Sequence, residues 1–96
     1  MSNEKVISLF LEGKQGKTPN RKINGVYIYE GRTLQTIDNV LYNYNTRIAK
    51  LDDNIVYLNI DKYSRTTSTI QNMIRRLAIG MGLVVIDVHE EELGVS

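Results

Sequence analysis

Hydroxyl and cationic side chains gather in one short run, residues 62–71, which reads KYSRTTSTIQ. The run precedes apolar residues at helical spacing, so it forms the predicted entrance of a helix. A helix entrance carries unpaired N–H groups and about half a positive charge, and it can hold a phosphate or a carboxylate. Serine and threonine are also ordinary N-cap residues. The run therefore has two open interpretations, an anion site or a plain helix cap.

Catalysis finds little support in the residue types. The single histidine, His89, precedes three glutamates and could form a general base with Glu90. One histidine without cysteine leaves a transition-metal site short of nitrogen and sulfur ligands. Asp52 and Asp53 are adjacent carboxylates, but beside Asn54 they are typical of a hairpin turn. We therefore expect no enzymatic activity, no metal site and no cofactor, with a small hydrolase based on His89 and Glu90 as the remaining enzymatic alternative.

Four tyrosines form two pairs with a spacing of two residues, Tyr27 with Tyr29 and Tyr42 with Tyr44. This spacing places both members of a pair on one face of a predicted strand. Exposed tyrosines beside cations can stack nucleic-acid bases, and tyrosine with arginine also anchors protein interfaces. Tyrosines can equally cover a small sheet with their hydroxyl groups in water. Aromatic content alone therefore does not identify the partner.

The net charge of +1 conceals a segregated distribution. Residues 13–32 hold five cations and one glutamate, residues 64–80 hold three arginines and no acid, and residues 87–96 hold four acids. The small net charge excludes a heavily acidic DNA mimic and a heavily basic DNA-coating protein. Local patches of either sign are compatible with it.

Length and composition predict one soluble domain over residues 1–96. No apolar run approaches the roughly 20 residues of a membrane span, and residues 1–5 lack the layout of a signal peptide. The chain has no cysteine, so packing rather than disulfides must stabilise it. We expect a cytoplasmic protein without a membrane partner.

Periodicity predicts a short N-terminal helix over residues 3–12, capped by Ser2 or Asn3 and stopped by Gly13. Residues 13–22 are rich in glycine, lysine and other polar residues, and they precede the first strand-like segment of the sequence. They are therefore predicted to be an exposed basic loop. Candidate strands follow at residues 26–29, 33–37, 40–44, 47–51 and 55–60. The last two form the most distinct hairpin, around residues 52–54.

A longer helix is predicted over residues 69–79, with Ser68 and Gln71 as its capping box and Gly80 and Gly82 at its end. The nearly continuous apolar run 83–88 is typical of a central strand covered on both faces. Residues 90–96 are predicted to be a frayed acidic tail. The fold class is therefore α+β, a single small antiparallel sheet of about five strands with one long helix packed on it and a short N-terminal helix.

Residues 41–49 (LYNYNTRIA) and 62–72 (KYSRTTSTIQN) resemble small proteins encoded by bacterial viruses. Those proteins carry a Tyr-x-x-Thr-x-Ile-Ala strand and a Tyr-Ser-x-Thr-Thr-Ser helix entrance. In many relatives a histidine is expected after the Thr-Thr-Ser of the second motif, and here Thr69 and Ile70 stand in its place, so any role of that imidazole is absent. The resemblance implies an origin in a phage or prophage of a low-GC bacterium, and it implies no mechanism.

The leading hypothesis is a non-enzymatic, phage-derived protein that blocks a host protein or protein–nucleic acid complex, for instance as an anti-CRISPR type inhibitor of bacterial defence. Its predicted contacts are Tyr42, Tyr44, Arg65, Arg75 and Arg76. The alternative is a small nucleic-acid-binding accessory protein that uses Lys14, Lys17, Arg21, Lys22, Arg32, Tyr27 and Tyr29. An uncovered edge at residues 26–29 would also allow a homodimer by strand pairing.

Overall fold

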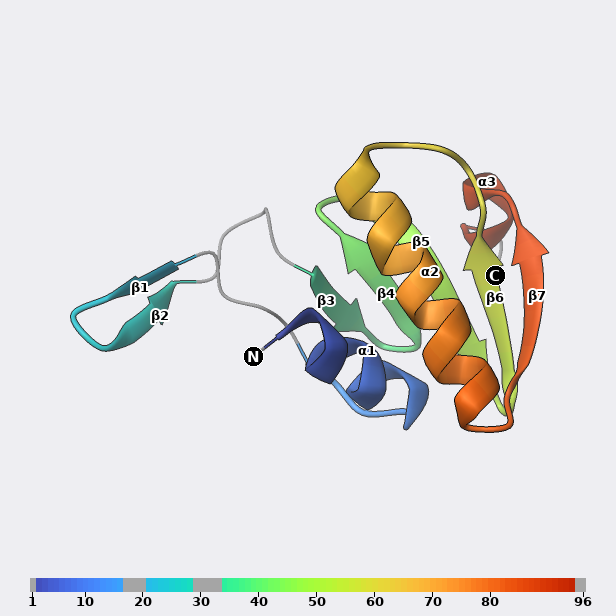
Figure 1. The fold of residues 1–96 in the computed structure, drawn as a ribbon, viewed down its shortest axis with the longest axis horizontal. Coiled ribbons are helices and arrows are strands. Elements are labelled where there is room, and N and C mark those ends of the chain that lie inside the picture. Colours follow the sequence, from blue (N-terminus) through green and yellow to red (C-terminus); the bar gives the residue numbers. More distant parts are fainter. Residues whose placement is uncertain (1, 17–20, 29–33, 95–96) are drawn as a thin grey trace.

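The computed structural model describes residues 2–16, 21–28 and 34–94, and Figure 1 shows the arrangement of their elements. In chain order these elements are α1 (Asn3–Leu11), β1 (Arg21–Ile23), β2 (Val26–Ile28), β3 (Leu34–Ile37), β4 (Val40–Asn43), β5 (Thr46–Asp52), β6 (Ile55–Asn59), α2 (Arg65–Gly80), β7 (Val84–Val88) and α3 (Glu90–Leu93).

Four two-residue turns connect consecutive antiparallel strands. The first residue of each turn has a positive φ, at Asn24 (50°), Asp38 (55°), Tyr44 (58°) and Asp53 (55°). Asn and Asp tolerate this left-handed conformation better than most residues, so three of the turns follow from local chemistry. The hairpin around Asp53 confirms the most distinct of the sequence predictions.

The main sheet has the strand order β3-β4-β5-β6-β7. Its first four strands are antiparallel neighbours, whereas β7 runs parallel to β6 because α2 crosses between them. The structure confirms the predicted α+β class, with a five-stranded, mostly antiparallel sheet, one longer helix and a short N-terminal helix. Strand β2 lies outside this sheet and pairs with β1 in a separate two-stranded sheet (Figure 1).

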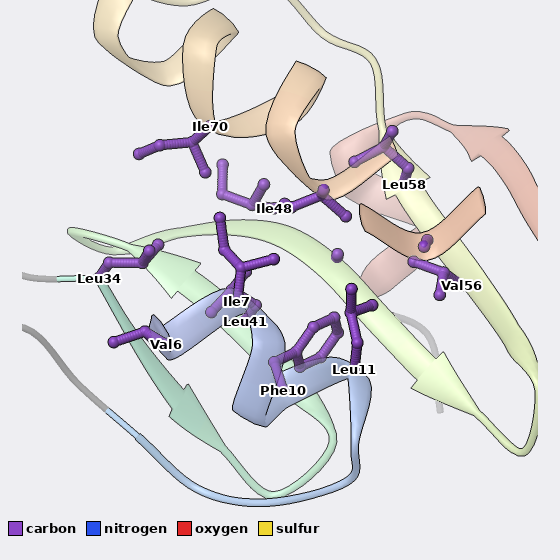
Figure 2. Close-up of a cluster of buried hydrophobic side chains, with 13 residues drawn as sticks. Val6, Ile7, Phe10, Leu11, Leu34, Leu41, Ile48, Val56, Leu58 and Ile70 are labelled. Atoms are coloured by element: carbon purple, nitrogen blue, oxygen red, sulfur yellow. The ribbon is translucent and has the colours of Figure 1, made fainter. Parts of the chain in front are cut away.

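Both α1 and α2 cover the same face of the main sheet (Figure 1). Figure 2 shows the side chains that meet there, with Ile7 and Phe10 from α1 facing Leu41 and Ile48 from the sheet. A β-bulge in β5 leaves Ile48 without an opposite residue in β4. Leu41 pairs with Ala49, and the next residue of β4, Tyr42, pairs with Arg47. The bulge explains why the consecutive residues Ile48 and Ala49 are both fully buried.

Strand β7 lies at the edge of the sheet, so the predicted central position is wrong for the single chain. Val84 and Ile86 are 49% and 40% exposed, on the face opposite α1 and α2. Only Val85 contacts the core from this strand, while Val88 is buried. An apolar run indicates burial on both faces, and this strand is apolar without such cover.

Helix α2 begins at Arg65, four residues before the predicted start. Its N-cap is Ser64, whose Oγ accepts a hydrogen bond from Thr67 N at 3.2 Å, so the predicted capping box is wrong. The side chain of Gln71 instead donates to the carbonyl oxygens of Asn59 and Asp61, at 2.8 and 2.9 Å. The helix ends at Gly80, and Gly82 adopts a left-handed conformation with φ of 78°, in agreement with the expected role of these two glycines at the helix end.

Two further expectations need correction. The predicted frayed tail contains α3, whose Leu93 is buried, so residues 90–93 are part of the folded body. Arg21 and Lys22 lie in β1 rather than in a loop. None of the described helices is long and apolar enough to cross a membrane.

Candidate functional site

A buried amide joins the end of β6 to the start of α2. The Nδ2 of Asn59 donates to Arg47 O at 2.7 Å and to Tyr63 Oη at 3.0 Å, while its Oδ1 accepts from Asp61 N at 2.8 Å. Asparagine suits this position because its side chain offers two donors and an acceptor. Among the described residues, no buried side-chain polar atom lacks a partner. The network therefore fixes the position of residues 59–63 against β5.

The hydroxyl groups at the entrance of α2 serve the fold in the same way. Asn43 Nδ2 donates to Thr67 Oγ1 at 3.1 Å, and Thr67 Oγ1 lies 3.2 Å from Ser64 Oγ. Thr69 Oγ1 donates to Arg65 O at 3.1 Å. These contacts engage three hydroxyl groups of the run within the chain, and they favour its helix-cap interpretation.

His89 forms a carboxylate pair, but with Asp61 rather than with Glu90. Its Nδ1 lies 2.6 Å from Asp61 Oδ1, and Asp61 Oδ2 accepts from Glu90 N at 3.0 Å. The hydrogen bond from Glu90 N, followed by that from His89, lowers the pKa of Asp61. The hydrogen bond to Asp61 raises the pKa of His89. Sequence reasoning missed Asp61 because it lies on another element, 28 residues away.

This pair positions α3, since Asp61 accepts both from His89 and from the first residue of that helix. The carboxylate of Glu90 lies 3.6 Å from Arg47 Nη1, which ties α3 to β5. The second ring nitrogen of His89 makes no hydrogen bond to any residue that the structure describes. Within the same residues, no cluster of three His, Cys, Asp or Glu side chains could hold a metal ion.

The outer surface of α2 carries a polar stripe with two arginines, here called the α2 stripe: Arg65, Thr69, Asn72 and Arg76. The spacing i, i+4, i+7, i+11 puts these exposed side chains on one side of the helix, over about 16 Å. The buried residues Ile70, Ile74 and Ala78 lie on the opposite side. Neither Arg65 nor Arg76 has an ion-pair partner within the described ranges, and the sequence has no acid between Asp61 and Asp87.

The third predicted arginine of this helix has a different environment. Arg75 Nη2 donates to Asp87 Oδ1 at 2.7 Å, which ties α2 to β7. Its charge is therefore neutralised within the chain. Arg75, one of the five predicted contacts, therefore differs from Arg65 and Arg76 in having an ion-pair partner within the chain.

Two exposed tyrosines lie at the end of the sheet where α2 begins. Tyr44 is in the β4–β5 turn and Tyr63 immediately precedes the N-cap, and they are 45% and 44% exposed. The bond between Asn43 and Thr67 holds this turn against the first turn of α2. Sequence reasoning did not select Tyr63 as a contact, although its position before Ser64 was a usable signal.

Tyr42 is separated from this pair. It lies in β4 opposite Arg47 and is half-buried, whereas Tyr44 has left the strand with a φ of 58°. The prediction that both tyrosines share one strand face is therefore wrong. Of the five predicted contacts, Arg65 and Arg76 lie on the α2 stripe and Tyr44 lies in the turn that Asn43 holds against the start of α2. Tyr42 lies within β4, and Arg75 is paired with Asp87.

The residues of the nucleic-acid alternative are only partly described. Lys14 is exposed, and its Nζ lies 3.8 Å from Glu12 Oε2. Arg21, Lys22 and Tyr27 lie in the β1–β2 hairpin. Lys17, Tyr29 and Arg32 lie outside the described residues.

A shallow hollow lies beside α3 on the sheet face opposite α2. It has a volume of about 260 Å³ and is lined by Lys50, Asp52, Tyr57, Val88, Glu92 and Leu93. Small-molecule pockets typically measure about 300–1,000 Å³ and are mostly apolar. The hollow is below this range and mixes both signs of charge, so it does not indicate a small-molecule site.

Comparison of the chain with models of known protein families finds no match, and comparisons with curated proteins and with solved structures find none either.

Proposed function

We propose that this chain is a binding protein that acts without catalysis, by holding the α2 stripe and its neighbouring tyrosines against an acidic macromolecular surface. The observation that carries this proposal is the pair of exposed arginines, Arg65 and Arg76, on one side of a helix that has no acidic residue. Arginine binds carboxylates and phosphates through paired, charge-assisted hydrogen bonds. An acidic partner would therefore satisfy both cations at once.

The helix offers these groups from a rigid base. Ser64 caps its first turn, Thr67 is bonded to Asn43, and Gln71 is bonded to the end of β6. A surface that is already ordered loses less conformational entropy on binding. Tyr44 and Tyr63 add exposed aromatic area beside the first turn, and tyrosine and arginine are among the residues that dominate interface energies.

The identity of the partner rests on the resemblance to proteins of bacterial viruses. We propose a host protein or protein–nucleic acid complex in the bacterial cytoplasm, with a defence complex such as a CRISPR effector as the specific hypothesis. An inhibitor of this kind needs no catalytic group, because occupation of a functional surface is sufficient. Electrostatic complementarity would provide both orientation and a fast association rate.

Direct binding of nucleic acid is the second candidate, because the α2 stripe would also fit a row of phosphates. Phosphate binding weakens steeply with salt, as counterions are released from the nucleic acid. A mobility-shift titration at low ionic strength with the purified chain and random duplex DNA and RNA tests it. Absence of a shift would reject this candidate and leave the protein partner.

Affinity capture with the tagged full chain tests the leading proposal. The bait is incubated with a nuclease-treated lysate of a low-GC bacterium, and bound proteins are identified by mass spectrometry. We expect a partner that the chain captures and that the double variant Arg65→Glu/Arg76→Glu loses. Glutamate in the first helical turn is favourable for the helix dipole, so Arg65→Glu is compatible with folding.

A matched control makes the same change of charge elsewhere. Lys5→Glu/Lys14→Glu alters two exposed lysines on and after α1 and leaves the α2 stripe intact. We expect this variant to retain the partner. Retention of the partner by the stripe variant, or equal loss from both variants, would contradict the assignment of the α2 stripe as the binding surface.

A further inference from the structure

Among the residues that the structure describes, strand β7 has no neighbour on one of its two edges, and the bonds to β6 show which of its backbone groups face that edge. Val84 N donates to Asn54 O and Ile60 N donates to Val88 O, both at 2.9 Å, so the even-numbered residues of β7 point toward β6. Successive residues of a strand point their N–H and C=O groups to opposite sides. The backbone groups of Val85 and Asp87 therefore face the free edge.

The opposite edge of the sheet is occupied. Thr36 N of β3 donates to Gly16 O at 2.8 Å, and Gly16 N donates to Thr36 Oγ1 at 2.7 Å. Gln15 adds a contact with Asp38 O at 2.6 Å. Residues 15 and 16 thus contact the outer edge of β3, whereas among the described residues no strand lies on the outer edge of β7. A chain with one open edge forms a closed pair rather than a filament.

We propose that β7 pairs with β7 of a second copy of this chain, antiparallel and centred on Ile86. This register places Val85 opposite Asp87 of the partner, and the reverse, in two pairs that each exchange both N–H···O bonds. Ile86 then faces its own counterpart in the non-hydrogen-bonded position, where side chains are closest. The product is a continuous sheet with five strands from each chain.

The side chains favour a second copy as the occupant. Val84 and Ile86 are exposed on one face of β7, and the centred register brings these apolar groups of both copies together. Asp87 is the only charged residue of the strand, and Arg75 neutralises it at 2.7 Å, so two copies approach without repulsion. The nearly continuous apolar sequence of β7, typical of a central strand, then occupies a central position.

The register also fixes how the two helices lie. Residues directly opposite each other point to the same face of a sheet, so the Ile86 faces of both chains coincide. Both α2 helices therefore lie on the other face of the joined sheet, on the same side. The inference is independent of the proposed function, since the α2 stripe takes no part in the pairing.

Sedimentation of the untagged full chain over a range of concentrations tests the pairing. We expect the wild-type chain to reach twice the 11.0 kDa of one copy. Ile86→Lys would bring two lysines together at the twofold axis, and we expect this variant to remain at the mass of one copy. Ile37→Lys is the matched control, an exposed isoleucine at the covered edge of the same sheet, and we expect it to dimerise like the wild-type chain.

A single cysteine tests the register, because the chain has none of its own. A non-hydrogen-bonded antiparallel pair has a Cα–Cα distance of about 4.5 Å, within the range that a disulfide spans. We expect Ile86→Cys to form a disulfide-linked dimer under mild oxidation, and we expect Ile37→Cys, whose cysteine lies away from the pairing edge, to form no disulfide-linked dimer. Absence of the covalent dimer for Ile86→Cys would overturn the proposed register.

Two other results would overturn the pairing itself. A dimer that persists in Ile86→Lys would place the interface elsewhere, for instance on the β1–β2 hairpin. A wild-type chain that stays monomeric at the highest concentration would show that β7 does not pair with a second copy. If Ile86→Lys then also lost a protein that the wild-type chain captures from a lysate, the free edge of β7 would be assigned to a strand of that protein. Neither result bears on the α2 stripe, which has its own variants.

Discussion

The imidazole of His89 and the carboxylate of Asp61 meet at 2.6 Å between Nδ1 and Oδ1, although 28 residues separate them in the chain. Asp61 follows β6 and His89 follows β7, so the contact joins the ends of two neighbouring parallel strands. The second oxygen of Asp61 accepts from Glu90 N and holds the first residue of α3. One carboxylate thereby attaches α3 to the sheet.

The pair predicts a pH window of maximal stability. The pKa of His89 is raised above its ordinary 6.5, so its contribution is complete below pH 6.5 and is lost as the pH rises through the raised pKa. The pKa of Asp61 is lowered below its ordinary 3.8, so its contribution is present above pH 3.8 and is lost as the pH falls through the lowered pKa. We expect the pair to stabilise the fold most between these two values.

NMR titration of the imidazole measures this directly, since His89 is the only histidine. We expect a pKa above 6.5 in the wild-type chain and a lower one in Asp61→Asn, which removes the charge and retains the size of the side chain. The thermal midpoint of His89→Gln should fall below that of the wild-type chain inside the window and approach it at higher pH. Identical imidazole pKa values in both chains would contradict the contact.

Two serines at the entrance of α2 distinguish the observed cap from the predicted one. Ser64→Ala removes the oxygen that accepts from Thr67 N, and we expect it to cost about 1 kcal/mol in the free energy of unfolding. Ser68→Ala lies within the helix, and we expect a change within about 0.5 kcal/mol. Urea unfolding of both variants measures the difference. A larger loss for Ser68→Ala would restore the start near Thr69 that the sequence pattern predicted.

The elements that sequence patterns predicted are those with local causes. The hairpin at Asp53 follows from a turn residue that tolerates positive φ, and the apolar stripe of α2 follows from helical spacing. The start of α2 was missed because Thr67 and Ser68 have modest helix propensity, while the contact between Thr67 and Asn43 comes from another strand. Long-range contacts of this kind leave no local pattern.

The candidate surface was predictable to a similar extent. Arg65 and Arg76 could be placed on one surface from their spacing, since both lie in a single helix. The pairing of Arg75 could not be predicted in this way. Its partner Asp87 lies on β7, and the position of β7 depends on how α2 crosses the sheet between β6 and β7. The pair of His89 with Asp61 has the same origin, and neither contact follows from residue spacing.

Asn59 is expected to be the most sensitive polar residue of the described core. Asn59→Ala would leave Arg47 O, Tyr63 Oη and Asp61 N without their partner, and we expect a loss of about 2–3 kcal/mol in the free energy of unfolding. Asn72→Ala is the control, because Asn72 is exposed on the α2 stripe. Denaturant unfolding measures both, and equal stability of the two variants would contradict the structural role of the amide.

Retention on dense heparin connects the α2 stripe to the pairing of β7. Two stripes on the same side of a joined sheet would bind an anionic surface together, and the second contact then gains from a high effective concentration. Ile86→Lys adds a cation, which by itself strengthens binding to heparin, but it removes the second stripe. We therefore expect Ile86→Lys to elute at lower salt than the wild-type chain, while Ile37→Lys, with the same added charge and an intact pair, elutes no earlier than the wild-type chain. Later elution of Ile86→Lys would show that charge alone governs retention and that the two stripes do not act together.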